Sequence, residues 1–273
     1  MAIKKSLALI GTDVEVFLRH KITKKYKSIE GLIGGSKDSP KPLEKDGCFI
    51  QEDGCAAEYN VPPVSLQDSH TMFNNIQYVM DTITNLVPDE FELECCSSAH
   101  FDKEELSTEQ AQTMGCDVDY NCWEDGTVNT KPNTPETMRS CGGHIHISMP
   151  DMTAEESLAL VKALDCYLGV PSILIDQDTE RRTIYGKAGA FRFKYYENIP
   201  AIEYRVLSNW WTKSDDYVKW VFLQIEKALE SVIEKENLDI YKDDIVSIIN
   251  TSNTEAAITF CENLNINIPF EVV

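Results

Sequence analysis

The sequence predicts an α+β fold built around a mostly antiparallel sheet. Segments with strand and helix patterns are interspersed along the 273 residues without regular β-α-β alternation. The composition, with 42% hydrophobic residues, is that of an ordinary globular protein. Because no internal repeat or long linker forces a boundary, we expect one domain spanning residues 1–273.

Period-two and period-3.6 patterns give the elements of the first half of the chain. Asp53-Gly54 is a common hairpin dipeptide, and Pro62-Pro63 is expected to end the strand before it. Weak periodicity and polar turns over 102–139 indicate a long functional loop or lid, and 31–47 indicates a shorter loop. The regular elements expected here are strands at 7–18, within 48–61 and at 91–95, and an amphipathic helix at 67–86.

The second half begins with a clear strand pattern at 141–149, which opens on Gly142-Gly143. Thr153 and Glu156 have the spacing of a capping box, which predicts a helix to about Leu168. The remaining expected elements are strands at 190–195 and 201–207 and helices at 214–234, 243–249 and 254–264.

Charge and composition exclude several classes of partner. The chain has 25 basic and 45 acidic residues, a formal charge of −20, which disfavours bulk nucleic-acid binding. The first residues hold only a short apolar run at 7–10, and no segment approaches a spanning helix, so we expect no membrane partner. Nine cysteines without a CxxC pair indicate reduced thiols and a cytoplasmic protein.

Two strand segments carry carboxylates on one face. Asp13 and Glu15 are two residues apart in an apolar strand, so their side chains point the same way. Like charges in that position repel unless a cation lies between them, and Mg²⁺ prefers oxygen ligands. Glu58 and Asn60 share a face in the same manner. The alternative is an exposed strand face with both acids in water.

The hairpin residues before Glu58 allow two interpretations. Glu52 and Asp53 either shape the turn or add ligands to the cation site, and the sequence favours neither.

The segment Gly142-Gly143-His144-Ile145-His146 is the sharpest local signal. His144 and His146 share one strand face, which favours a metal-ligand or phosphate-contact role over two structural histidines. The paired glycines would let a nucleotide approach the backbone closely. A His-x-His pair also suits a zinc site with carboxylates, so a metallohydrolase stays open at this point.

A basic cluster follows in this acidic chain. It begins at Arg181-Arg182 and continues through Arg192, Lys194 and Arg205, with Glu203 among its members. Guanidinium groups suit phosphates because they offer a rigid donor fork. The alternative is an ion-pair lattice without a ligand. Acids for cations, histidines at phosphates and arginines for the transferred group are the parts of a phosphoryl-transfer site. Neither a P-loop nor a G-x-G-x-x-G motif is present.

The order of these motifs resembles the glutamine synthetase and glutamate–cysteine ligase superfamily, and more narrowly the phage-type COOH–NH₂ ligases (amidoligases). The matching segments stand in the same order over about 195 residues: Gly11-x-Asp13-x-Glu15-x-Phe17, Glu58-x-Asn60, Gly142-Gly143-His144-Ile145-His146 and Ile202-Glu203-Tyr204-Arg205.

The resemblance implies a curved sheet with helices on one face and a concave face that binds ATP and Mg²⁺ or Mn²⁺. ATP would phosphorylate a carboxylate, and an amine would displace the phosphate. By position, the implied metal ligands are Asp13, Glu15, Glu58, His144 and Glu203. The implied nucleotide contacts are Gly142, Gly143, His146, Arg182 and Lys194. The implied catalytic groups are Arg192, Glu203 and Arg205.

The chain also departs from glutamine synthetase. It has Asp13 where a glutamate is usual and lacks that enzyme's small N-terminal domain, which leaves a homo-oligomer possible but unspecified. Without an ammonia-site signature, an amino acid or peptide is the expected amine, and the acid is unspecified. The alternatives are a guanidino-kinase-like phosphotransferase, a non-catalytic ATP/Mg-binding protein and a zinc hydrolase built on the histidine pair.

Overall fold

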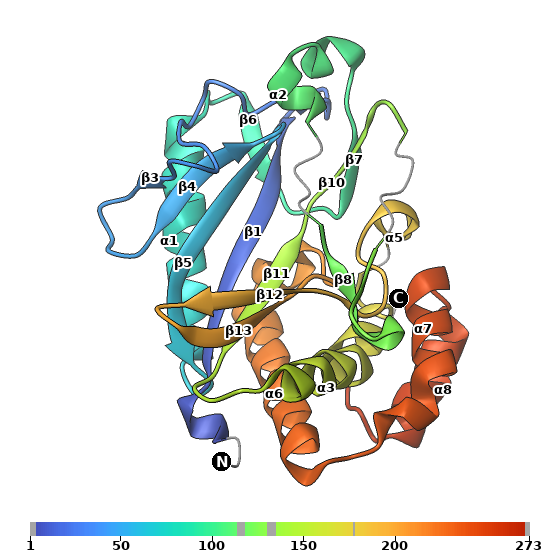
Figure 1. Ribbon diagram of the computed structural model, residues 1–273. Helices are drawn as coiled ribbons and strands as arrows, with labels where there is room; N and C mark the ends of the chain where they lie inside the picture. Colours follow the sequence, from blue (N-terminus) through green and yellow to red (C-terminus); the bar gives the residue numbers. More distant parts are fainter. Residues whose placement is uncertain (1–3, 114–117, 130–134, 177, 271–273) are drawn as a thin grey trace.

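A large antiparallel sheet organises the computed structural model, which describes residues 4–113, 118–129, 135–176 and 178–270 (Figure 1). Eleven strands form this sheet, in the order β3-β4-β5-β1-β11-β13-β12-β8-β9, with β2 and β6 also paired to β1. Every pairing among the described strands is antiparallel. The predicted α+β class is confirmed.

The strands of the main sheet are β1 (Leu9–His20), β2 (Tyr26–Lys27), β3 (Lys41–Pro42), β4 (Phe49–Asp53), β5 (Ala56–Ser65), β6 (Phe91–Glu94), β8 (Tyr120–Asn121), β9 (Thr127–Val128), β11 (Gly143–Ser148), β12 (Ala190–Tyr196) and β13 (Ile199–Tyr204). A separate pair is formed by β7 (Ser98–His100) and β10 (Met138–Ser140). In Figure 1, β12 and β13 cross the direction of β5 and β1 at a steep angle, so the sheet is strongly twisted.

The helices are α1 (Ser69–Leu86), α2 (Glu109–Gln112), α3 (Ala154–Leu164), α4 (Val170–Ser172), α5 (Arg181–Ile184), α6 (Asp215–Glu234), α7 (Lys242–Thr251) and α8 (Thr254–Asn263). The long helices agree with the predicted segments within a few residues. Thr153 and Glu156 form the expected capping box at the start of α3. The helix then continues through a π-helical turn at Asp165–Gly169 into α4, beyond the predicted end at Leu168.

The main core lies between one face of the sheet and the helices. Val14, Val16 and Ile145 are fully buried on that face, and Ile76 and Val79 of α1 belong to the same cluster. Because side chains alternate along a strand, burial of these residues sends their neighbours at 13, 15, 144 and 146 to the opposite face. That opposite face carries the candidate site.

The prediction that Pro62-Pro63 ends a strand is wrong. β5 continues to Ser65, and its register against β1 shifts between the pairs Thr12–Val61 and Ile10–Val64. The two prolines therefore lie at a β-bulge, where ladder hydrogen bonds are interrupted and the missing N–H groups cost little.

The described parts of 102–139 hold short elements rather than one long loop. β8 and β9 form a hairpin that extends the sheet at β12, and β10 pairs with β7. Residues 114–117 and 130–134 of the predicted lid lie outside the described residues.

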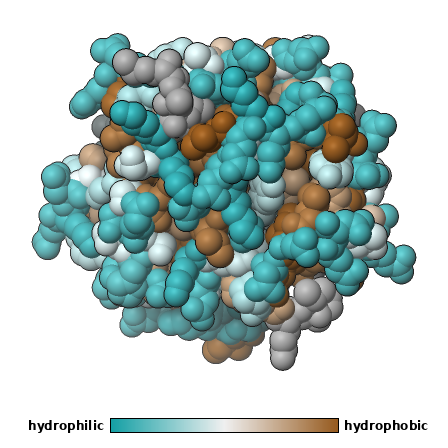
Figure 2. All heavy atoms as spheres, turned by 90° about the horizontal axis from the view of Figure 1, so that it is seen from below, coloured by the Kyte–Doolittle hydropathy of each residue, from teal (hydrophilic) through white to brown (hydrophobic). Residues whose placement is uncertain are grey.

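Polar side chains cover most of the face in Figure 2, where hydrophobic spots are scattered among them. None of the helices in the described ranges is both long and apolar enough to cross a bilayer. The eight cysteines in these ranges are free thiols, and Cys116 lies outside them.

Candidate metal and anion site

The carboxylate and histidine strands meet on the face of the sheet away from the long helices. Glu15 of β1 pairs directly with Glu58 of β5, and Asp13 pairs with His144 of β11. The side chain of Asp13 is only 16% exposed, so the acids do not stand in open water as the alternative interpretation had it. Adjacent antiparallel strands bring these residues together, which explains why their spacing of two was informative.

The same face continues over two more strands. His146 lies opposite Glu203 of β13, and Glu203 lies opposite Arg192 of β12. The side chain of Glu203 is fully buried. Residues from β5 to β12 thus form one continuous polar surface.

The first metal-competent group consists of Asp13, His144 and Glu203. One ligand atom from each lies within 4.8 Å of the other two. His144 Nδ1 lies 2.9 Å from Asp13 Oδ1 and 3.7 Å from Glu203 Oε1. Burial acts to raise the pKa of Asp13, but His146 and His144 outweigh it and hold this pKa well below its usual range. Burial, followed by the positive charge of Arg205, lowers the pKa of His144 to about 4, so its imidazole is neutral at pH 7. A neutral imidazole and two carboxylates are a suitable donor set for a divalent cation.

The second metal-competent group consists of Glu15, Asp53 and Glu58, again with ligand atoms within 4.8 Å of one another. Burial and the nearby Asp53 raise the pKa of Glu15 to about 8. Burial, with Asp13 and Glu15, raises the pKa of Glu58 well above its usual range. Glu15 and Glu58 thus resist ionisation beside a third carboxylate, and a hard ion such as Mg²⁺ would relieve this crowding.

Backbone and side-chain donors hold this second group in place. Glu15 Oε2 accepts a hydrogen bond from the Gly142 N–H at 2.5 Å, and Glu58 Oε2 accepts one from Gln51 Nε2 at 2.6 Å. The sequence left Asp53 open between a turn and a ligand role, and the structure places it in this group. Glu52 points elsewhere, because its carboxylate accepts from the backbone N–H groups of Gly31, Ile33 and Gly34.

The basic residues converge on Glu203. Arg192 Nη1 lies 3.3 Å from Glu203 Oε1, Lys194 Nζ lies 3.0 Å from Oε2, and Arg205 also contacts Oε1. The ion-pair lattice that the sequence left open is therefore present, and it borders the first metal-competent group. Arg205 Nε also lies 3.6 Å from Asp119, a residue that sequence reasoning missed because it stands in the weakly patterned segment before β8.

Arg182 does not join this cluster. Its side chain is 2% exposed, its Nη2 donates to Ser172 Oγ at 3.2 Å, and its Nη1 lies 3.9 Å from Asp176 Oδ2. The expectation that Arg182 contacts a nucleotide is therefore not supported by its position. The physical reason is that Arg182 lies on α5 rather than on a sheet strand, so its side chain packs into the core with the segment after α4.

The space beside Gly142 and Gly143 is occupied by neighbouring parts of the protein. A Cβ on Gly142 would lie 2.4 Å from His144 Nε2, and one on Gly143 would lie 2.5 Å from the Ser208 carbonyl oxygen. The space left by the two missing side chains is filled by the protein itself rather than left for a nucleotide. Their small size instead allows His144 and the Ser208 backbone to approach β11.

His146 has a partner that sequence reasoning missed. Tyr196, the last residue of β12, has its hydroxyl 2.5 Å from His146 Nδ1, and the two rings stack at 5.9 Å. His146 Nε2 lies 3.3 Å from Asp13 Oδ2. Strand alternation from Arg192 and Lys194 places Tyr196, and not its neighbour Tyr195, on the site face, a signal that the sequence analysis did not use.

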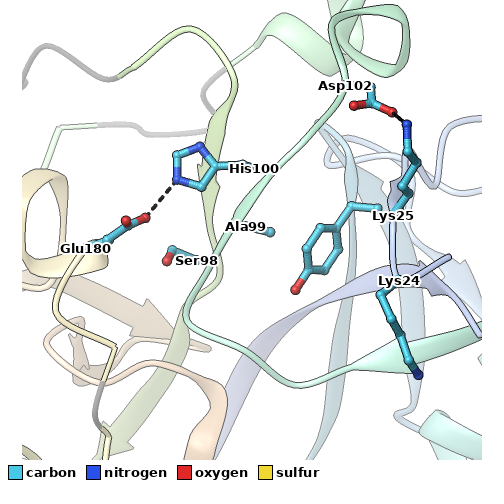
Figure 3. Close-up of a pocket in the computed structure, with 8 residues that line it drawn as sticks. Lys24, Lys25, Ser98, Ala99, His100, Asp102 and Glu180 are labelled. Atoms are coloured by element: carbon cyan, nitrogen blue, oxygen red, sulfur yellow. Dashed lines mark hydrogen bonds and ion pairs between the residues drawn. The ribbon is translucent and has the colours of Figure 1, made fainter.

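A separate hollow of about 370 Å³ lies between the residues after β1 and strand β7 (Figure 3). Figure 3 shows His100 turned toward Glu180 on one side and Lys25 toward Asp102 on the other, at 2.9 Å and 2.7 Å. None of the predicted site residues lines this hollow. It is bordered by Tyr26, whose ring packs with Phe17 and Phe101.

Residues 129–244 match the profile of a family described as phage phiEco32-like COOH.NH2 ligase-type 2. This match confirms the predicted resemblance to phage-type COOH–NH₂ ligases. The family description names a joining of carboxyl and amino groups, so carboxylate–amine ligase is the class of enzyme that the match supports. No curated protein matches the chain significantly.

The matched segment contains His144, His146 and the basic cluster around Glu203. Asp13, Glu15, Asp53 and Glu58 lie outside it and join the site only through the fold.

Proposed function

We propose that this protein is an ATP- and Mg²⁺-dependent carboxylate–amine ligase that works through an acyl phosphate. The observation that carries the proposal is the pairing of two metal-competent groups, side by side on one sheet face, with a cluster of cations at one end. The family match supports the carbon–nitrogen ligase class, and the site supports the use of a polyphosphate.

Each end of the site has a distinct task in this proposal. Asp13, His144 and Glu203 would hold one divalent ion, and Glu15, Asp53 and Glu58 a second. When bound, such ions neutralise phosphate charge and orient the transferred group. Lys194, with a side chain 36% exposed, and the partly buried Arg192 border the first group, where they would bind phosphate oxygens or the substrate carboxylate.

The proposed reaction has two steps. A carboxylate oxygen attacks the γ-phosphorus, a new O–P bond forms, the bond to the β,γ-bridging oxygen breaks, and ADP leaves. The amine nitrogen then attacks the acyl carbon, phosphate leaves with the original carboxylate oxygen, and the nitrogen loses a proton. We propose an amino acid or peptide as the amine, a small carboxylate as the acid, and a cytoplasmic location.

The direct test is ³¹P NMR of ATP incubated with the protein, Mg²⁺ and pooled amino acids. ADP and phosphate that appear only when both a carboxylate and an amine are present would support the ligase. A phosphorylated acceptor formed without an amine would instead favour the guanidino-kinase-like alternative. ATP that is bound but never consumed would favour a non-catalytic nucleotide-binding protein.

A further inference from the structure

Tyr196 and His146 form a contact that the proposed reaction has not yet used. The Tyr196 hydroxyl lies 2.5 Å from His146 Nδ1, and the interplanar angle of 21° makes the rings nearly parallel. The other ring nitrogen, Nε2, faces Asp13 Oδ2 at 3.3 Å. Each nitrogen of His146 therefore has a different neighbour, and together these neighbours determine where its proton lies.

Asp13 is the neighbour whose charge favours a proton on Nε2. Its carboxylate lies between the two imidazoles, with Oδ1 2.9 Å from His144 Nδ1 and Oδ2 3.3 Å from His146 Nε2. A bare Nε2 lone pair facing this carboxylate would be repelled, whereas an Nε2–H would be attracted. The proton of neutral His146 therefore belongs on Nε2, and Nδ1 is left as an acceptor for the Tyr196 hydroxyl.

The Nε2–H of His146 is also available to a ligand. Nε2 is buried, and within the described residues it makes no aligned hydrogen bond, because the contact with Asp13 has ion-pair distance only. A buried N–H without an aligned acceptor is costly unless a ligand completes it. An anionic oxygen bound beside Asp13 and the cations at Glu203 would supply that acceptor.

His144 is oriented in the opposite way. Its Nδ1 points into the first metal-competent group, and its Nε2 lies against Gly142. The two histidines of the His-x-His segment thus present different atoms to the site, one suited to a metal and the other to an oxyanion.

The hairpin register explains how Tyr196 reaches His146. Glu197 and Asn198 both have positive φ, 49° and 70°, as a two-residue type I′ turn requires. This turn places Tyr196 opposite Ile199 at the end of β12. The strand between β12 and β11 carries Ala201 on the same face as Glu203, and this small side chain leaves room for the tyrosine to lie across β13.

We propose that Tyr196 is a positioning residue that fixes His146 as the Nε2-protonated tautomer, so that the phosphate contact expected of His146 is made by a donated N–H. The identity of the phosphate ligand rests on the proposed function, but the tautomer does not. Tyr196 supplies no ligand atom to either metal-competent group.

The tautomer is tested by long-range ¹H–¹⁵N NMR of histidine-labelled protein at about pH 8, where most histidines are neutral. A His146→Gln variant assigns the signals. Wild type should show His146 with Nε2 protonated and Nδ1 bare, and Tyr196→Phe should show a mixture of the two tautomers. Tyr195→Phe is the matched control, because Tyr195 is 72% exposed and should leave the pattern unchanged. An Nδ1-protonated His146 in wild type, or an unchanged tautomer in Tyr196→Phe, would overturn the proposal.

The donor role is tested by kinetics and metal binding. Tyr196→Phe should raise the KM for ATP roughly 2- to 10-fold, as loss of one oriented hydrogen bond does, while the Mn²⁺ affinity stays that of wild type. A fall in Mn²⁺ affinity would contradict the separation of roles between the two histidines. If the protein never consumes ATP but the NMR spectra show the expected tautomer, the proposed function is wrong. The inference that Tyr196 fixes the tautomer of His146 is then still supported.

Discussion

Glu15 and Glu58 lie directly opposite each other on β1 and β5, both partly buried and both with a raised pKa. Like charges in opposite positions of a ladder destabilise a sheet. The protein nevertheless places a third carboxylate, Asp53, beside them. A fold that tolerates this arrangement is most readily explained by a cation that binds there.

Glu58→Gln should therefore have effects of opposite sign on stability and on metal binding. In alkaline buffer above the raised pKa values of both acids, the metal-free variant should melt at a higher temperature than wild type, because the pair then carries one negative charge instead of two. Its Mn²⁺ affinity should fall by at least the roughly 10- to 100-fold typical of weaker outer-shell changes. Calorimetric melting and Mn²⁺ titration by electron paramagnetic resonance measure the two effects.

Glu52→Gln is the control for that variant, because Glu52 belongs to the same hairpin but accepts three backbone N–H groups. It should lose stability and keep its Mn²⁺ affinity. Equal loss of metal affinity in both variants would show that the hairpin, rather than the carboxylate group, had been disturbed.

Stability of the metal-free protein should fall between about pH 6.5 and pH 8. The folded pKa of Glu15 is raised to about 8, above its unfolded value, so the folded state holds an extra proton that it loses as pH rises. His144, with a folded pKa lowered to about 4, has the opposite effect only at lower pH, while its unfolded form titrates near pH 6.5. The free energy of unfolding should therefore fall by about 1–2 kcal/mol across this pH range.

Urea denaturation at a series of pH values checks this prediction. Glu15→Gln should reduce the fall of the free energy of unfolding with pH, and so should Mg²⁺ added to wild type. Glu58, whose pKa is also raised, contributes in the same direction. Burial raises the pKa of Asp165 to about 7, so Asp165 also makes the folded protein less stable as pH rises. The Asp165→Asn variant measures this contribution separately. A wild-type stability that rises through this window would contradict the account of the carboxylate group.

Gly142→Ala should damage the site through His144. The added Cβ would lie 2.4 Å from His144 Nε2, which forces the ring away from Asp13 and Glu203. Gly11→Ala is the matched control, since its nearest neighbours would be 3.7 Å away. Mn²⁺ affinity should fall at least roughly tenfold in Gly142→Ala, as is typical when a residue that orients a metal ligand is changed. It should stay that of wild type in Gly11→Ala. A wild-type affinity in Gly142→Ala would mean that His144 is not held by this packing.

Substitution of Arg182 should mainly lower stability, whereas substitution of Arg192 should mainly lower catalytic activity. Arg182→Gln leaves Asp176 buried without its nearby cation and should cost about 3 kcal/mol in the free energy of unfolding. Arg192→Gln, at the edge of the site, should cost less stability and abolish most ATP turnover. Denaturation curves and steady-state rates make the comparison, and reversed effects would return Arg182 to the site.

The sequence predicted those site residues that alternate along strands. Asp13, Glu15, His144 and Glu203 were found because a period of two places side chains on one face whatever the surrounding fold. Asp53, the last residue of β4, was left open between a turn and a ligand role, and Asp119 lies outside the regular patterns, so only tertiary structure places both beside the other site residues. For Gly142 and Arg182 the nucleotide contact stays a prediction, and the packing of His144 and of Asp176 against them has no periodic signature that the sequence could show.

The central claim is that a carboxylate is activated by phosphoryl transfer, and ¹⁸O transfer tests it most directly. A carboxylate substrate labelled with ¹⁸O would be incubated with ATP, Mg²⁺ and the amine, and the released phosphate analysed by mass spectrometry. The account predicts one ¹⁸O atom in each phosphate, and none without protein. Phosphate that forms at the same rate but carries no ¹⁸O would contradict the acyl-phosphate route.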